Sequence, residues 1–577
     1  MMKLLKRNSA GFRLAMILSV VTLISHAMLD LYLPTVNANL TNYGMARGDI
    51  PYILKMGALM LGVLLVSTTA MIGSSYFSSK TAMGIGRNMR EEFFRHVQSL
   101  SQGDVNEIGT ASLITRGTND VQQVTNAAML MLRLMLMAPT MFVGGIIMAW
   151  QKCPDLGWIV LCPLPLILAV ILYMMKKGMP LFKSIQKKVD TVNQIVREYL
   201  SGIRVIRAFC KDEHETGRFD LANDDLMQVS LKVNRMLAFL MPVMMLLVNA
   251  TNIAIVWIGG HYMTENRVQV GDLTAFITYV SMILMSVMFM SLLFVILPRA
   301  SASADRIGEV LSRKPHIEDP KTPKTVQPLR GGYVTFDDVS FSYPGADTPV
   351  LEHISFSIRP GEVTAIIGGT GSGKTTLLNL LPRFYDVTDG AIYIDGTDVR
   401  DLSQEQLRAR IGLVPQKSFL FTGSVADNIR FGKEDATEEE IIEALKTAQA
   451  YDFVSAMEEG IHTQITQGGT NVSGGQRQRL AIARALVRRP ELYLFDDSFS
   501  ALDYKTDAAL RKALFEKIES SAVLIVAQRV STIMNADRIL VLNDGVIAGC
   551  GTHAQLMREC EVYHEIVLSQ LSESEVG

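Results

Sequence analysis

The sequence predicts a chain of two parts: an α-helical membrane domain with six transmembrane helices and long cytoplasmic extensions, followed by a soluble α/β P-loop domain. Apolar runs of about 20 residues recur before residue 305, which is the length that a helix needs to cross a bilayer. After residue 305, charged and apolar residues mix as they do in soluble α/β domains. Within this second part, VTAIIGGTGSGKTT, from Val363 to Thr376, joins a strand-like apolar run to a glycine-rich loop.

Six apolar segments in the first part are long enough to span a bilayer. They lie at residues 12–33, 51–78, 132–150, 156–175, 237–260 and 275–298, with a tight turn around Pro154 between the third and fourth. Residues 176–235 hold twelve Lys or Arg, whereas the loops on the opposite side hold one each, namely Arg47, Lys152 and Arg267. Because positively charged loops stay in the cytoplasm, we expect a multi-pass protein of the cell (plasma) membrane, embedded in the lipid bilayer, with both termini cytoplasmic.

The two connections on the cytoplasmic side, at about residues 79–131 and 176–236, are far longer than turns. Apolar residues recur there at helical spacing, as at Ile195, Tyr199, Ile203 and Ile206. Each connection is therefore predicted to continue two membrane helices into the cytoplasm and to join them at a tip, near Gly109 in the first and near Gly202 in the second. The alternative is a pair of solvated, charged linkers.

The glycine-rich loop carries the strongest motif in the chain. Gly368, Gly373, Lys374 and Thr375 fill the fixed positions of G-x-x-x-x-G-K-[ST]. In this motif backbone N–H groups surround phosphates, the lysine reaches the outer phosphates and the hydroxyl binds Mg²⁺. The apolar run from Leu377 continues a helix whose positive N-terminus faces the anion.

Other candidate residues flank this loop in the sequence. Asp496 and Asp497 follow the apolar run from Leu492 to Phe495, which is typical of a magnesium-binding carboxylate at the end of a buried strand. Ser473 to Gln476 form a second anion-binding sequence, SGGQ, ahead of an arginine-rich helix. Tyr343 precedes the phosphate loop, either to stack on an adenine ring or to pack as a core aromatic.

Composition excludes several other classes of site. The net charge of −2 gives no reason to expect nucleic acid as a partner. The five cysteines are scattered without paired or metal-ligand spacing, which argues against a disulfide framework or a zinc site.

The order of these motifs, ending in Ser500-Ala501-Leu502-Asp503, resembles the nucleotide-binding domain of an ABC transporter over residues 330–570. The six preceding helices, with DLTAFITYV near residue 272 and RASASADRI near residue 299, resemble the exporter type of that family. The resemblance implies a transmembrane domain at 1–305 with two coupling loops, a linker at 306–330 and an ABC nucleotide-binding domain at 331–577. It also implies a dimer that holds ATP and Mg²⁺ between a P-loop and the SGGQ of the other subunit.

By this resemblance, ATP is bound by the aromatic, P-loop and SGGQ residues, and Mg²⁺ by one hydroxyl, one amide and one carboxylate. The ATP-binding set is Tyr343, Gly368, Gly371, Ser372, Gly373, Lys374, Thr375, Thr376, Gln416, Ser473, Gly474, Gly475 and Gln476. The metal set is Thr375, Gln416 and Asp496, and the catalytic positions are Asp497, Gln528 and Asp503.

Two of the catalytic positions depart from the pattern of active family members. Asp497 stands where they have a glutamate that acts as base for the attacking water, and Gln528 stands where they have a histidine. The shorter carboxylate is withdrawn by about 1.5 Å, the length of one C–C bond. A glutamine cannot carry a proton at neutral pH. The two changes together predict a degenerate site that binds ATP and hydrolyses it slowly, as in one half of a bacterial heterodimeric multidrug exporter.

The transport path is less defined by the sequence. Met241, Met245, Asn249 and Asn252 share one face of the fifth helix, and Met282, Met285 and Phe289 share one face of the sixth. These faces either line a pocket for varied apolar compounds or pack between helices. Asp30 and His26 are expected near the outer interface and Arg133 at the inner one.

The leading hypothesis is therefore an ATP-hydrolysing translocase: a subunit that exports small hydrophobic or amphipathic compounds together with a second half-transporter, the fast site belonging to that partner. The alternatives are export of a lipid, peptide or thiol compound, and a regulatory subunit whose own site is a permanent ATP clamp.

Overall fold

The computed structural model describes residues 1–577 apart from 266, 325–330, 501, 518–519 and 571–577. The chain forms two compact units, one of residues 1–98 and 110–313 and one of residues 99–109 and 314–577. A short piece of the first long connection, residues 99–109, thus belongs to the second unit.

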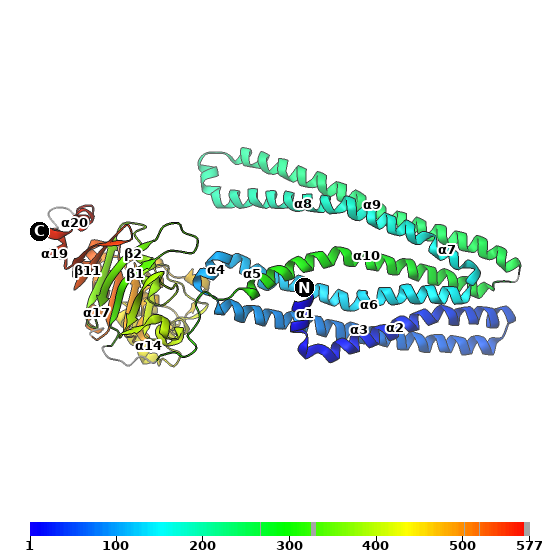
Figure 1. Cartoon of the computed structure of the whole chain (residues 1–577), viewed down its shortest axis with the longest axis horizontal. Coiled ribbons are helices and arrows are strands. Elements are labelled where there is room, and N and C mark those ends of the chain that lie inside the picture. The colour runs from blue at the N-terminus through cyan, green and yellow to red at the C-terminus, as the bar shows by residue number, and fades with distance from the viewer. Residues whose placement is uncertain (266, 325–330, 501, 518–519, 571–577) are drawn as a thin grey trace. The chain divides into compact units, whose positions relative to one another are not determined.

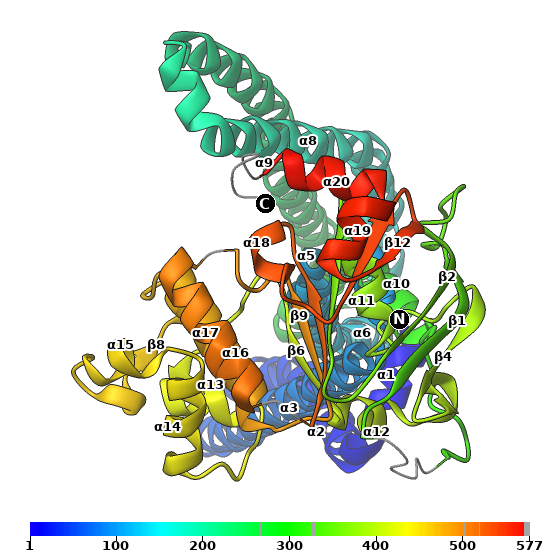
Figure 2. The same ribbon diagram turned by 90° about the vertical axis from the view of Figure 1, so that its left-hand side faces the viewer.

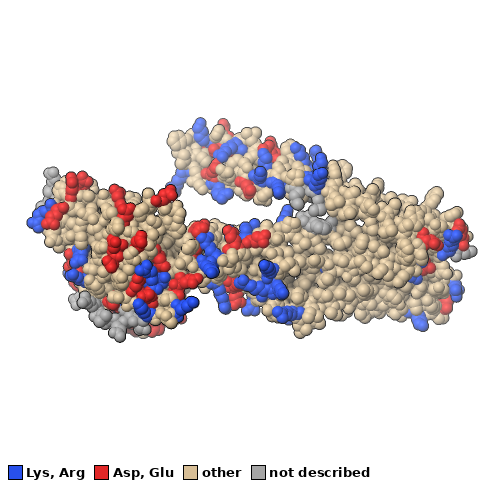
Figure 3. All heavy atoms as spheres, viewed as in Figure 1, with Lys and Arg blue, Asp and Glu red and all other residues tan. Residues whose placement is uncertain are grey.

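Helices, both long and short, make up the first unit (Figure 1). They are α1 (Met2–Asn8), α2 (Arg13–Asn39), α3 (Ile50–Ser99), α5 (Thr110–Thr115), α6 (Val121–Lys152), α7 (Gly157–Leu161), α8 (Pro163–Ala208), α9 (Asp212–Thr264) and α10 (Val270–Ser312). Within the described residues, six helical stretches are long and apolar enough to cross a membrane, which confirms the predicted number. Figure 3 shows a wide band of these helices almost without charged side chains, flanked at both ends by charged ones.

The core of the bundle lies between α2, α6 and α10. The Tyr279 hydroxyl of α10 donates to the carbonyl oxygen of Leu31 at 2.9 Å and lies 2.7 Å from the Thr35 hydroxyl, both in α2. Close approach to α6 depends on Gly145, where an added Cβ would lie 2.7 Å from Ile283. A tyrosine hydroxyl in an apolar core needs such partners, because an unpaired buried polar group is costly.

The two long connections that are predicted to be cytoplasmic end differently from each other. Gly109, with φ +82°, ends α4 (Gln102–Ile108), as predicted for the first tip. The prediction of a tip at Gly202 is wrong, because α8 continues through this residue to Ala208 and the turn lies at residues 209–211. A glycine inside a helix costs only about 1 kcal/mol, which the pairing of α8 with α9 outweighs. Likewise α10 extends to Ser312, so the first residues of the predicted linker are helical.

Polar side chains of the membrane segments bind one another in this unit. The Arg133 guanidinium donates to the hydroxyls of Ser75, Ser78 and Ser79 at 2.7 to 3.0 Å, and its position at the inner interface stays a prediction. His26 is buried and lies 2.7 Å from the Ser67 hydroxyl, which donates to Asp30. The side chains of His26 and Asp30, both in α2, thus lie between α2 and α3.

The second unit contains α4 and two larger sheets (Figure 2). The six-stranded sheet has the order β12-β11-β3-β10-β9-β6, and all neighbouring pairs are parallel except β11 with β12. Its strands are β3 (Val363–Gly368), β6 (Ile411–Val414), β9 (Leu492–Asp496), β10 (Ala522–Val526), β11 (Arg538–Asn543) and β12 (Val546–Gly551). The antiparallel sheet, β2-β1-β4-β5, consists of β1 (Val334–Phe341), β2 (Leu351–Ile358), β4 (Asp389–Ile394) and β5 (Thr397–Asp398).

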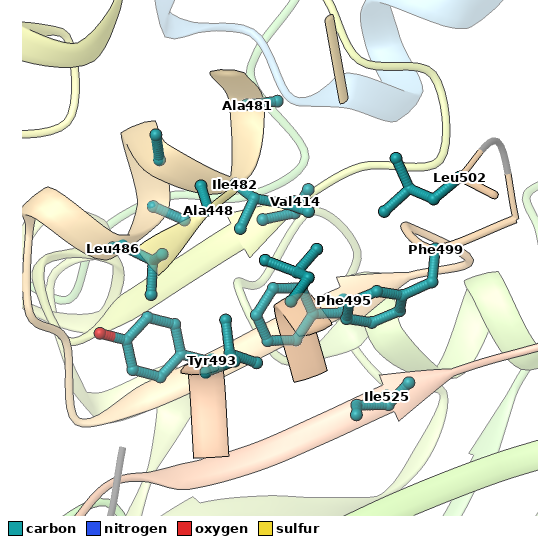
Figure 4. Packing of buried hydrophobic residues seen from close by; sticks show 14 of the residues in the cluster. Val414, Ala448, Ala481, Ile482, Leu486, Tyr493, Phe495, Phe499, Leu502 and Ile525 are labelled. Atoms are coloured by element: carbon teal, nitrogen blue, oxygen red, sulfur yellow. The ribbon is translucent and has the colours of Figure 1, made fainter. Parts of the chain in front are cut away.

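Helices cover one face of the parallel sheet, and the antiparallel sheet lies on the other side (Figure 2). The remaining elements are α11 (Lys374–Leu380), α12 (Gln404–Ala409), α13 (Val425–Arg430), α14 (Glu438–Thr447), α15 (Tyr451–Ser455), α16 (Gly474–Val487), α17 (Tyr504–Lys517), α18 (Val530–Ile533), α19 (His553–Glu559), α20 (Glu561–Leu568) and the short strands β7 (Gly423–Ser424) and β8 (Gln464–Ile465). Figure 4 shows Phe495 of β9 packed with Phe499, which lies in the loop after β9, and with Ile482 of α16. A strand that is buried on both faces of a sheet has an almost continuous run of apolar residues. Such runs in the sequence predict the strands β3 and β9.

Candidate functional site: the carboxyl edge of the parallel sheet

The candidate site lies where β3, β10, β9 and β6 end. Four loops leave these parallel strands at one edge: the P-loop after β3, Gln416 after β6, Asp496 and Asp497 at the end of β9, and Gln528 after β10. Ligands of open α/β sheets bind outside the carboxyl ends of the strands. The topology therefore assembles four motifs that are far apart in the sequence.

Glycines allow the P-loop to take its shape. Gly371 and Gly373 have φ values of +87° and +95°, which side chains other than glycine rarely adopt. At Gly368 an added Cβ would lie 2.0 Å from the carbonyl oxygen of Leu542. At Gly369 and Gly371, by contrast, it would meet open space. The loop is thus packed against β11 at its base and bare where a phosphate would approach.

Lys374 is buried in this loop. Its ammonium group donates to the carbonyl oxygens of Gly368 at 2.9 Å and Gly369 at 2.6 Å, and to the Ser372 hydroxyl at 3.4 Å. Burial lowers the pKa of Lys374, against the raising effect of the carboxylates of Asp497 and Asp496. These contacts hold the cation within the loop that would receive phosphates.

The predicted metal residues are brought together in part. The Thr375 hydroxyl donates to Asp496 Oδ1 at 3.1 Å, although the two residues are 121 positions apart. Burial raises the pKa of Asp496, and Thr375 opposes this effect. A buried carboxylate beside a hydroxyl is an oxygen donor set that Mg²⁺ prefers. The third predicted ligand, Gln416, contacts Asp497 instead, with its Nε2 donating to Asp497 Oδ2 at 3.3 Å.

Asp497 is held by its backbone in a sparsely populated conformation. Its φ is +46°, and its N–H donates to the carbonyl oxygen of Val526 in β10 at 2.8 Å. Its own carbonyl oxygen accepts from the Ser500 hydroxyl at 2.9 Å. Left-handed backbone at a residue other than glycine occurs often at functional sites, where the surrounding structure enforces it.

The loop of Gln528 is anchored by a residue that the sequence analysis missed. Gln570, just after α20, donates from Nε2 to the carbonyl oxygen of Gln528 at 2.8 Å and accepts from the Val530 N–H at 2.8 Å. One amide thus joins the backbone of the exposed Gln528 to that of Val530, two residues further along the loop. A lone glutamine near the end of the chain carries no sequence signal of such a role.

Tyr343 lies beside the P-loop but also packs as an aromatic. Its hydroxyl is 3.0 Å from that of Thr376, and its ring meets those of Phe341 and Tyr385 edge-on, with centroids 5.0 and 5.3 Å apart. The interpretation as a packing aromatic thus describes its contacts, and stacking on an adenine ring stays a prediction. Tyr385, which the sequence analysis did not single out, extends the cluster to α4.

The SGGQ residues cap α16. Ser473 Oγ accepts from the N–H of Gln476 at 3.3 Å, and Gln476 Oε1 accepts from the N–H of Ser473 at 2.9 Å. Ser473 and Gly474 are exposed, and Gly475 starts the first turn together with Gly474. The positive end of a 14-residue helix therefore faces solvent.

Asp503 caps the start of α17. Its carboxylate accepts from the Thr506 N–H at 3.0 Å, and this contact lowers the pKa of Asp503. Ala501, within the same motif, lies outside the described residues. The role that the resemblance implies for Asp503 therefore stays a prediction.

The segment of residues 99–109 packs on the same unit, next to Tyr343. Asn106 of α4 donates to the Tyr385 hydroxyl at 3.3 Å, and an added Cβ at Gly103 would lie 3.2 Å from the Tyr385 ring. Asp104 is fully buried and accepts from the Ser101 hydroxyl at 2.7 Å, from the His316 N–H at 3.3 Å and from the His316 ring. A cleft of about 730 Å³ lies among α4, Tyr343 and Tyr385.

The residues at the sheet edge fit ATP and Mg²⁺. Bare backbone at Gly369 and Gly371 leaves room for phosphates, Lys374 supplies a cation, and Asp496 with Thr375 supplies oxygen ligands. Among the described residues no cluster of three or more His, Cys, Asp or Glu forms a separate metal site.

Comparisons with known proteins agree with this geometry. Residues 16–287 match the family described as "ABC transporter transmembrane region", and residues 351–500 match the family "ABC transporter". An uncharacterized ABC transporter ATP-binding protein of Mycobacterium tuberculosis is 42% identical over 568 residues, covering 98% of this chain and 97% of the relative.

Two further relatives carry more specific names. A probable multidrug resistance ABC transporter ATP-binding/permease protein of Bacillus subtilis is 34% identical over 88% of this chain and 87% of its own length. An ATP-dependent lipid A-core flippase of Syntrophus aciditrophicus is 33% identical over 88% of this chain and 84% of its own length.

Proposed function

Because the chain belongs to the ABC transporter family, with membrane and ATP-binding domains fused as in exporters, we propose that it is the hydrolysis-impaired subunit of a heterodimeric exporter. The observation that carries this proposal is the pair Asp497 and Gln528 beside an otherwise complete ATP site. The transported compounds are small and hydrophobic or amphipathic, and they leave a cell whose cytoplasm contains both chain termini.

Asp497 supports slow hydrolysis at this chain's own site. Its carboxylate is engaged by Gln416 at 3.3 Å and is shorter by one methylene than a glutamate. A misplacement near 1 Å of a reacting group can lower a rate by about a hundredfold. General base catalysis by the side chain of residue 497 is therefore weakened, although its backbone is held in place.

Gln528 replaces the second residue that would take part in ATP hydrolysis. Its loop is held by Gln570, so its backbone is in place, but an amide neither accepts nor delivers a proton at neutral pH. A hydrogen bond to phosphate remains possible.

Binding functions are retained. With ATP bound, Lys374 would hold the outer phosphates and Tyr343 would support adenine, while Thr375 and Asp496 would hold Mg²⁺, which would neutralise charge on the phosphates. Gln416, which contacts Asp497 in this structure, would be the third ligand of Mg²⁺. A site that binds but scarcely hydrolyses keeps its ligand for many cycles.

Ser473, which is exposed, and Gly475, which is half-buried, serve the other site. Their helix terminus is intact and suited to a phosphate, and in the dimer it completes the site on the partner's P-loop. A homodimer would contain two slow sites, whereas a heterodimer has one slow and one fast. The intact SGGQ therefore favours a partner chain with a competent base.

The membrane domain supports export of apolar compounds. On the proposed lining faces, Met245 and Asn249 of α9 and Met285 of α10 are exposed, whereas Met282 packs against the bundle core. The side chain of Met241 lies outside the described residues. The relative named a multidrug resistance transporter favours this substrate class, and the relative named a lipid A-core flippase favours lipid as the second candidate.

ATPase measurements test the proposal. Purified alone in lipid, this chain should show turnover near background, and assembly with its partner should restore it. Asp497→Glu with Gln528→His should speed hydrolysis at this chain's own site, and Asp497→Glu alone should give less. Robust, substrate-stimulated turnover by the chain alone would refute the heterodimer.

A further inference from the structure

A small cleft lies between α1 and the neighbouring ends of α2, α3 and α6. Its volume is about 420 Å³, and its walls include Leu5 of α1, Met16 of α2, Ile85 of α3 and Met131 of α6. These walls are almost wholly apolar. The cleft is separate from the nucleotide site and from the proposed lining faces on α9 and α10.

The cleft lies at the level where the apolar segments of three helices begin or end. Met16 is three residues inside α2, Ile85 is shortly after the apolar part of α3, and Met131 directly precedes the apolar run of α6. Polar headgroups and acyl chains meet at this boundary of a bilayer. The cleft therefore lies at the level of the leaflet at the N-terminal end of α2.

Polar contacts fix α1 on α3 and so form the cleft. Arg7 pairs with Glu92, which also accepts from Asn8 Nδ2 at 3.0 Å, and Asn88 donates to the carbonyl oxygen of Asn8 at 3.1 Å. Just beyond α1, the Phe12 ring occupies the space above Gly84, where an added Cβ would lie 2.1 Å from the ring. The cleft is thus held by specific contacts on both sides of Ser9.

Two positive charges line the cleft without partners. Lys3 and Lys6 are exposed, and over the part of the chain that the structure describes neither forms an ion pair. Arg7, by contrast, is neutralised by Glu92. An occupant with an apolar chain and an anionic head would satisfy both the walls and the two lysines.

We propose that this cleft binds an acyl chain of an anionic phospholipid, with Lys3 and Lys6 contacting its phosphate headgroup. Lysines near a membrane surface extend their apolar stems along the protein while their ammonium groups reach the headgroups. Each such lysine favours anionic over neutral lipid, because anionic headgroups attract basic residues at the surface. The site attaches the N-terminal helix to one lipid class.

Photolabelling tests the proposal on the assembled transporter in nanodiscs of phosphatidylcholine. The probes are phosphatidylglycerol and phosphatidylcholine carrying the same photoreactive acyl chain, added separately. We expect phosphatidylglycerol to label the peptides around Ile85 and Met131 in preference to phosphatidylcholine. Lys3→Gln with Lys6→Gln should remove this preference, a drop of up to about thirtyfold for two charges.

Matched variants separate charge from folding. Lys176→Gln with Lys177→Gln removes the same charge at the predicted cytoplasmic boundary of α8, outside the cleft, and should leave the preference intact. Lys3→Arg with Lys6→Arg should keep it, and Met131→Trp, which fills the cleft, should abolish labelling by both probes.

Equal labelling by the two lipids in the unchanged protein, or a preference that survives loss of both lysines, would overturn the proposal. So would displacement of the probe by transported compounds, which would reassign the cleft to substrate. The readout is lipid contact and not ATPase or export, so it is independent of the proposed function.

Discussion

Replacing Asp104 by asparagine should loosen α4 from the nucleotide-binding unit. The side chain is fully buried and accepts hydrogen bonds from Ser101 and from both the backbone and the ring of His316. Asparagine has nearly the same shape but only one acceptor oxygen, and its NH₂ group would face donors. The change therefore tests the carboxylate without changing the packing.

The size of the effect follows from the pKa of Asp104. Burial alone would raise it, but the hydrogen bonds from Ser101 and His316 outweigh burial and lower the pKa from 3.8 to about 2. A lowering of nearly two pKa units corresponds to about 2 kcal/mol in favour of the bound carboxylate. Because the folded pKa is depressed, this stabilisation is present above pH 3.8 and is lost only as the pH falls towards 2. Near pH 7 the asparagine variant should thus lose about 1–2 kcal/mol of local stability.

Hydrogen–deuterium exchange of the assembled transporter measures this loss directly. Peptides from residues 99–109 should exchange about five to thirty times faster in the Asp104→Asn variant, if local opening controls exchange. Asp212→Asn is a matched control, since it makes the same substitution at an exposed position at the start of α9. Unchanged exchange of residues 99–109, or equal acceleration by Asp212→Asn, would refute the reasoning.

Three other changes probe the nucleotide site. Gln570→Leu removes both hydrogen bonds that hold the loop of Gln528 at this chain's own slow site, so hydrolysis of the ATP trapped on this chain should slow further, while the Kd for ATP at that site and the kcat of the assembled transporter change by less than about twofold; a rise in Kd, or an equal fall in overall kcat, would contradict a positioning role at this site. Lys374→Ala should weaken nucleotide binding to this chain and slow turnover at the partner's site, and trapping experiments should no longer find unhydrolysed ATP on this chain. Asp497→Asn should reduce ATPase less than Ser473→Ala, because only the latter touches the fast site; the reverse order would show that the roles are misassigned.

Motifs tied to strand ends were predictable from the sequence. Thr375 and Asp496 meet although 121 residues separate them, because each follows a buried apolar strand and parallel strands end at one edge. The six membrane segments were predictable for a similarly simple reason, the length of an apolar run.

Contacts that depend on tertiary packing were not predictable. Gln570 reaches Gln528 across 42 residues, and Asp104 reaches His316 across 212, with no motif at either end. The predicted tip at Gly202 was wrong, because the low helix propensity of a single glycine has a smaller effect than the packing of the two long helices α8 and α9. Arg133 of α6 donates hydrogen bonds to three serines that share one face of α3. These contacts could not be predicted, because they depend on how the two helices pack against each other.

The assignment of residues 99–109 to the second unit makes that unit discontinuous in the chain. A chimera that exchanges only residues 314–577 between two exporters would separate Tyr385 and His316 from the α4 residues that contact them. The foreign α4 would have to present its own partners at both positions. Functional exchange of nucleotide-binding units should therefore require the short segment and the long one to be transferred together, and substitutions in the two should be inherited as a pair.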